Sequence, residues 1–217
     1  LPQINTEGSI DSVVSVNAAA GFSIVKFTSN GSSPTVGHGL SSAPELVIWK
    51  NIDASENWWV QYNFVDGSDD YLILNLTDNK RDASAGWQGS LTSTTIKDFT
   101  IATNGQDVIA YCFHSVSGYQ KIGSYTGQTG SVSVTTGFQP RFVLIKKTNT
   151  STNGDWSIFD SNRMTSTTEG QLLPNRNYAE STRTGLIDFD SNGFTINNNT
   201  VGQINTNGDS YIYLAIK

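Results

Sequence analysis

The chain contains an internal repeat, and this feature limits its fold more than any other. One copy opens at Gly21 with GFSIVKFTSNG, and a second opens at Gly118 with GYQKIGSYTGQTG. Further blocks match in the same order: ELVIWK with RFVLIK, which aligns Lys50 with Lys146, then NWWVQY with DWSIFD, then the two closing blocks that begin FTI. Matched blocks in one order indicate a duplicated unit.

Within each copy, short runs rich in β-branched and aromatic residues are bounded by Gly, Asn, Asp and Pro. This pattern is typical of strands, and 36% hydrophobic with 15% charged residues fits a turn-rich β protein. We therefore predict an all-β fold of two tandem antiparallel β-sandwich-like repeats, either separate or fused into one domain. Repeat 1 covers residues 21–117, repeat 2 covers 118–217, and residues 1–20 form a lead-in strand or linker. Only residues 169–182 could hold a helical turn, which Pro174 limits.

Charge and motif content exclude several classes of function. A net charge of −6 is unsuited to nucleic acid, which needs a clustered basic surface. No apolar run reaches the roughly 18 residues of a membrane span, so we expect no membrane insertion. The single cysteine, Cys112, cannot form an internal disulfide and is expected to be buried. The chain has two histidines, of which His38 aligns with Thr136, and it has no phosphate-loop or nucleophile motif. We expect neither enzymatic activity nor a cofactor.

The blocks GFSIVKFTSNG, DVIAYCF, GSYTGQTGSVSVTTGFQPRFVLIKK and DFDSNGFTI also carry a family resemblance. Together they resemble a duplicated β-repeat family of bacteriophage tail-fibre and other virion structural proteins, of the marine and cyanobacterial phage type. The resemblance extends from Asn5 to the C-terminus and implies no catalytic residues. It implies a virion protein, located in the extracellular particle, that attaches to a host-surface glycan or protein.

The same resemblance implies that the partners include other virion proteins. Fibres are commonly homotrimers, and a monomer on a scaffold is the alternative. Two other functions stay open at this point. One is a purely architectural role as a capsid decoration or tail adaptor. The other is a polysaccharide-cleaving tailspike, for which paired carboxylates would be required. Asp66, Asp69 and Asp70 are the acids of one predicted loop that such a reaction could use.

Two tryptophans are the candidate ligand-binding residues. Sugar rings stack on aromatic side chains, while polar groups recognise the hydroxyls. Trp59 follows Trp58 and should point to the opposite face of its strand, and Trp87 lies in the Gly-rich stretch SAGWQG. The alternative for both residues is packing or a subunit contact.

The stretch DFDSNG provides a candidate metal site that we weigh against a turn. Asp188, Asp190 and Asn192 have the spacing that opens a calcium loop, but Asn199 stands where the bidentate Glu is required. Asp and Asn are also frequent in turns. We therefore predict a turn between Phe189 and Phe194 and no bound metal, with calcium as the weaker alternative.

Overall fold

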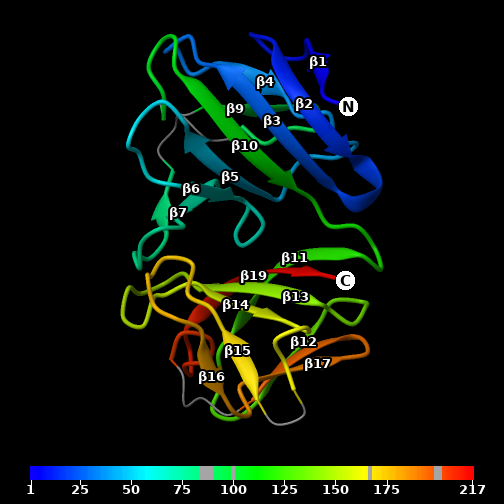
Figure 1. The fold of residues 1–217 in the computed structure, drawn as a ribbon, viewed down its shortest axis with the longest axis vertical. Helices are drawn as coiled ribbons and strands as arrows, with labels where there is room; N and C mark the ends of the chain where they lie inside the picture. Colours follow the sequence, from blue (N-terminus) through cyan, green and yellow to red (C-terminus); the bar gives the residue numbers. More distant parts are fainter. Residues whose placement is uncertain (84–89, 99–100, 166–167, 198–201) are drawn as a thin grey trace. The chain divides into compact units, whose positions relative to one another are not determined.

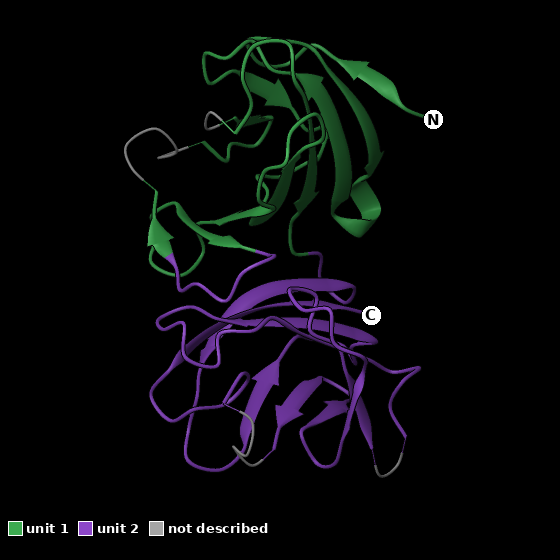
Figure 2. Cartoon of the chain, turned by 60° about the vertical axis from the view of Figure 1, so that its left-hand side comes forward, with its two compact units in different colours: residues 1–73, 81–115 green, residues 74–80, 116–217 purple. Residues whose placement is uncertain are grey.

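A computed structural model describes the chain except for residues 84–89, 99–100, 166–167 and 198–201. It confirms the predicted all-β class, because strands dominate and the helical structure of the described residues is one three-residue 3-10 turn, η1 (Ala18–Ala20). The chain forms two compact units (Figures 1 and 2). Unit 1 comprises 1–73 and 81–115, and unit 2 comprises 74–80 and 116–217.

Unit 1 is built on an eight-stranded antiparallel sheet. Its strands, in spatial order, are β1 (Gln3–Asn5), β2 (Ser12–Asn17), β3 (Phe22–Thr28), β10 (Asp107–Phe113), β5 (Leu46–Asn51), β6 (Trp59–Tyr62), β7 (Asp70–Ile73) and β8 (Arg81–Asp82). A second sheet pairs β4 (Thr35–Gly37) with β9 (Thr95–Lys97). Residues 1–20, expected as a lead-in strand or linker, thus supply β1 and β2, and β2 pairs with β3.

The core of unit 1 follows from the alternation of side chains along its strands. In β10, every second residue is buried, and Cys112 belongs to this buried set, as predicted. The inward side chains of the large sheet meet Val36 of β4 and Ile96 of β9 in one apolar cluster. This burial supplies the main stabilising free energy of the unit.

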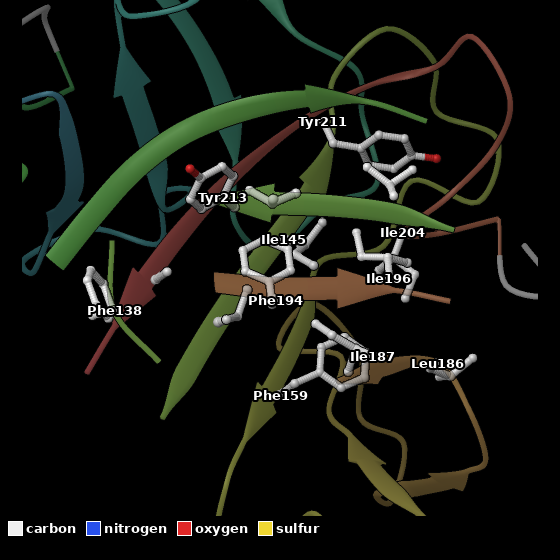
Figure 3. Packing of buried hydrophobic residues seen from close by; sticks show 14 residues of the cluster. Phe138, Ile145, Phe159, Leu186, Ile187, Phe194, Ile196, Ile204, Tyr211 and Tyr213 are labelled. Carbon is white, nitrogen blue, oxygen red and sulfur yellow. The ribbon is translucent and has the colours of Figure 1, made fainter. Parts of the chain in front are cut away.

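Unit 2 is a sandwich of two sheets with a small hairpin. The first sheet has the order β11 (Gln120–Thr126), β19 (Ser210–Ile216), β13 (Phe142–Lys147) and β14 (Ser157–Asp160); the second has β12 (Val132–Thr135), β18 (Gly193–Ile196) and β17 (Ile187–Asp190). Ile145, Phe159 and Tyr213 of the first sheet pack on Phe194 and Ile196 of the second (Figure 3). The hairpin pairs β15 (Glu169–Gln171) with β16 (Ser181–Arg183).

The two units share a strand order. β3, β10, β5 and β6 follow one another in unit 1 as β11, β19, β13 and β14 do in unit 2. The register agrees as well: Leu46 pairs with Tyr62 in unit 1, and Phe142 pairs with Asp160 at the aligned positions of unit 2. This agreement supports the duplication, which stays an inference from the sequence.

Residues 74–80 follow β7 of unit 1 in the chain, yet they belong to unit 2. The Lys80 amide donates to the Thr148 carbonyl at 2.6 Å, and the Lys146 ammonium donates to the Thr77 carbonyl at 3.2 Å. Gly154 approaches so closely that an added Cβ would lie 2.2 Å from the Thr77 oxygen. The repeat pattern of the sequence predicts instead that residues 74–80 belong to repeat 1, so the contacts of this segment differ from that expectation.

Candidate functional site

The predicted ligand-binding residue Trp59 lies on β6, beside the core of unit 1. It pairs with Trp49 across the β5–β6 ladder, is partly buried, and packs against the buried apolar cluster. Its ring centroid is 5.2 Å from that of Tyr71. Only part of the indole therefore meets solvent. Trp87, the second predicted residue, lies outside the described residues.

The candidate calcium loop forms a hairpin turn between β17 and β18, where Phe189 pairs with Phe194. Asp188 accepts a hydrogen bond from the Asn197 amide at 2.6 Å, and Asp190 accepts one from the Thr195 hydroxyl at 2.7 Å. The Asn192 carbonyl accepts from two backbone amides of the loop after β12. Both carboxylates are exposed and bind neutral donors. Among the residues described, no group of three or more His, Cys, Asp or Glu side chains could hold a metal ion.

A groove on unit 1, not found from the sequence, combines the features of a binding site. It has a volume of about 290 Å³ and crosses β1, β2, β3 and β10. Its lining residues are Ile4, Asp11, Ser12, Val13, Lys26, Phe27, Thr28 and Asp107. Of these, Val13, Lys26 and Thr28 alternate along their strands with buried residues, so they point away from the core.

The apolar part of the groove comes from two paired strands. Ile4 of β1 lies opposite Val13 of β2, and they are 73% and 45% exposed. Aliphatic side chains left in solvent at this level are common singly. Here they are paired neighbours that line the same groove, and they form its apolar part.

The polar part of the groove is a network centred on Asp107. Its carboxylate pairs with the Lys26 ammonium at 2.7 Å and accepts from the Thr28 hydroxyl at 2.7 Å. The hydrogen bond from Lys26, then that from Thr28, lowers the pKa of Asp107, while the bond to Asp107 raises the pKa of Lys26. Both groups are therefore charged at neutral pH. A carboxylate with a lowered pKa is a poor proton acceptor, so this arrangement suits binding rather than proton transfer.

The other titratable candidates lie apart from this groove. His38 is buried in the turn after β4, where Nε2 lies 3.1 Å from the Thr92 carbonyl and Nδ1 accepts from the Leu40 amide. Asp66 is exposed in a turn and accepts from Ser68, whereas Asp69 and Asp70 are buried at the start of β7.

The structure defines an antiparallel all-β protein of two units, the first of which carries a groove lined by both apolar and charged side chains. A family model, the domain of unknown function DUF7483, matches residues 2–217, so the chain belongs to this family. Comparisons with curated proteins and with solved structures gave no match. Among the described residues, no helix is long and apolar enough to cross a membrane.

Proposed function

We propose that this chain is a structural protein of a bacteriophage virion, of the tail-fibre type, and that it contributes to attachment to the host surface. The virion assignment is supported by the sequence blocks that resemble phage fibre proteins. The attachment role is supported by one observation, the groove that joins the exposed pair Ile4 and Val13 to the ion pair of Lys26 and Asp107.

The chemistry of the groove favours a ligand rich in hydroxyl groups. An ionised pair offers both donors and acceptors, and a hydroxyl can serve as either. The aliphatic floor favours a ligand that also has an apolar face, as a sugar ring does. Host-surface glycans combine both properties, and they lie where a phage particle must first bind.

The second candidate is a purely architectural role, as a spacer, capsid decoration or tail adaptor. It is supported by the two similar units, because a repeated β unit suits a spacer without any ligand. A polysaccharide-cleaving spike has less support, because none of the three acids proposed for it lines the groove. Asp66 lies in an exposed turn, and Asp70 is buried in the ladder opposite Tyr62.

The test is competition for adsorption. Host cells are incubated with the purified full chain before the phage that encodes it is added, and free phage is counted. We expect the chain to reduce adsorption several-fold, and the double variant Lys26→Ala, Asp107→Ala to lose this effect. Glu7→Gln, an exposed acid of unit 1 outside the groove, is the matched control and should compete like the wild type.

Gold-labelled antibody against the chain, applied to intact particles, locates it in the virion. Label on the fibres together with competition supports attachment. Label on the capsid or tail without competition would replace attachment by the architectural role, and absence of label on the particles would overturn the virion assignment.

A further inference from the structure

An exposed tyrosine of unit 2, Tyr178, lies in a loop segment whose two ends are held by ion pairs. Tyr178 is 67% exposed, the most exposed aromatic side chain of the described residues. It lies in the middle of the segment Arg176–Glu180, in which every residue is exposed. Exposure of a large aromatic ring has no folding benefit, so its position calls for another explanation.

Both ends of this segment are fixed by ion pairs. At one end, Arg176 Nε lies 2.6 Å from Asp155 Oδ1. At the other, Glu180 Oε2 lies 3.1 Å from Nη1 of Arg163. A loop anchored at both ends has fewer conformations than a free one, so a ligand that binds it loses less conformational entropy.

The anchor at Asp155 is reinforced through Asn175. The Asn175 side-chain amide donates to Asp155 Oδ1 at 2.6 Å, and its oxygen accepts from the Trp156 amide at 3.0 Å. Trp156 is buried in unit 2 next to β14, so the start of the loop is attached to the rigid part of the unit. Tyr178 is thereby held on a fixed base.

Arg176 also orients the ring itself. Its guanidinium carbon lies 5.9 Å from the centroid of the Tyr178 ring, within the range of a cation–π contact. Arg176 uses Nε for Asp155, and within the described part of the chain its two terminal nitrogens have no hydrogen bond. Hydrogen-bond donors therefore lie next to an exposed aromatic face.

The two arginines that hold the segment of Tyr178 are both paired with carboxylates, and this pairing favours a neutral ligand over a charged one. Arg176 is paired with Asp155, and Arg163 is paired with Asp160 and Glu180. An anionic ligand would gain little from cations that are already neutralised. A neutral ring with C–H groups on one face and hydroxyls at its edge matches the aromatic face and the guanidinium donors.

We infer that Tyr178 and Arg176 form a contact site for a neutral pyranose ring. The ring stacks on the face of Tyr178, and its hydroxyls accept hydrogen bonds from the terminal nitrogens of Arg176. This site deepens the proposed attachment function, on which it rests for the source of its ligand, and it is separate from the groove of unit 1.

The experiment uses saturation-transfer NMR on the full chain with methyl pyranosides of glucose, galactose, mannose and N-acetylglucosamine. The methyl glycoside of glucuronic acid serves as the anionic comparison. We expect transfer to at least one neutral glycoside, strongest at its ring C–H protons. Tyr178→Ala should abolish this transfer, whereas Tyr178→Phe should keep it because the stacking face remains. Arg176→Met should weaken binding several-fold.

Tyr119→Ala is the matched control, because Tyr119 is another exposed tyrosine of unit 2, at 39%. It should bind as the wild type does, and circular dichroism should show all variants folded. The inference is overturned by absence of transfer to every neutral glycoside, by transfer that persists in Tyr178→Ala, or by binding of the glucuronide alone. Sugar binding that depends on Tyr178 in a chain that fails to compete for adsorption would keep this site and reject the attachment function.

Discussion

Lys146 donates a hydrogen bond of 2.6 Å from its ammonium group to the carbonyl oxygen of Gly154, in the loop that follows its own strand. Lys50, at the aligned position of unit 1, does the same for the loop after β5, with three carbonyl acceptors between residues 51 and 56. Lys50 and Lys146 therefore make the same kind of contact in both units. In each unit the lysine ammonium donates hydrogen bonds to backbone carbonyl groups of the loop that follows its strand.

Replacing Lys146 by Met should destabilise the protein by about 2–4 kcal/mol, because the buried Gly154 carbonyl and the partly buried Thr77 carbonyl lose their donor. Lys50→Met is the matched control and should cost less, since Lys50 is partly exposed and water can replace it. Urea unfolding measures both changes. Equal losses in the two variants would contradict the explanation by burial.

Gly154→Ala should also destabilise the protein, by about 2 kcal/mol or more, because overpacking against backbone cannot be relieved by a side-chain rotation. The new Cβ would lie 2.2 Å from the Thr77 oxygen and 2.8 Å from that of Ser151. Gly130→Ala is the control: it has positive φ but open space around its Cβ, so its cost is conformational and near 1 kcal/mol. A Gly154→Ala protein as stable as the wild type would show that residues 74–80 can move away at little cost.

His38 should make the protein less stable in acid. Burial lowers the pKa of His38, a hydrogen bond to the Thr92 carbonyl opposes this, and His114 adds to the lowering. Because the folded pKa lies below the unfolded value, stability is complete above about pH 6.5 and is lost as pH falls, by at most about 1.4 kcal/mol per pH unit.

The measurement for His38 is the urea midpoint between about pH 7 and about pH 5. His38→Gln is the comparison, since its amide can still donate to the Thr92 carbonyl but does not titrate. The wild type should lose stability faster than this variant over the interval. Parallel curves would assign the acid sensitivity to other groups.

Cys112 should be unreactive in the native protein. It is fully buried, and burial raises the pKa of its thiol to about 12, so the reactive thiolate is scarce. A disulfide reagent should label it only at the rate of unfolding, and completely in denaturant. Because the chain has one cysteine, no other thiol contributes. Fast labelling under native conditions would show that β10 opens locally.

The strands of each repeat could be predicted well where burial and local preference agree. The run DVIAYCF coincides with β10, and FSIVKF with most of β3. The apolar run YLILNL (71–76) has the composition of one strand, but β7 ends at Ile73 because the residues that follow belong to unit 2. Residues 169–182, where the sequence allows a helical turn, instead make up most of the β15–β16 hairpin. In both cases, contacts with residues distant in the chain determine the secondary structure, and these contacts cannot be read from a local sequence pattern.

The binding candidates were harder to predict for a related reason. The groove combines side chains of the consecutive strands β1, β2 and β3 with Asp107 of β10, which is distant in the chain, so no sequence motif indicates it. Tyr178 stands alone in its segment, and its anchors at Asp155 and Arg163 become visible only with the hairpin in place. The sequence favours tryptophan as the sugar-stacking residue, whereas in the structure Trp59 packs beside the core.

The position of residues 74–80 bears on how the protein can be divided for study. A fragment that begins at Val116 includes most of unit 2 but lacks the acceptor for Lys146 at Thr77 and the donor to Thr148 at Lys80. In such a fragment, the buried ammonium of Lys146 keeps the Gly154 carbonyl as an acceptor but loses that of Thr77. The surface of Gly154 that Thr77 covers would also be exposed. We therefore expect a fragment cut at the predicted repeat boundary to be less stable than one to which residues 74–80 are also supplied.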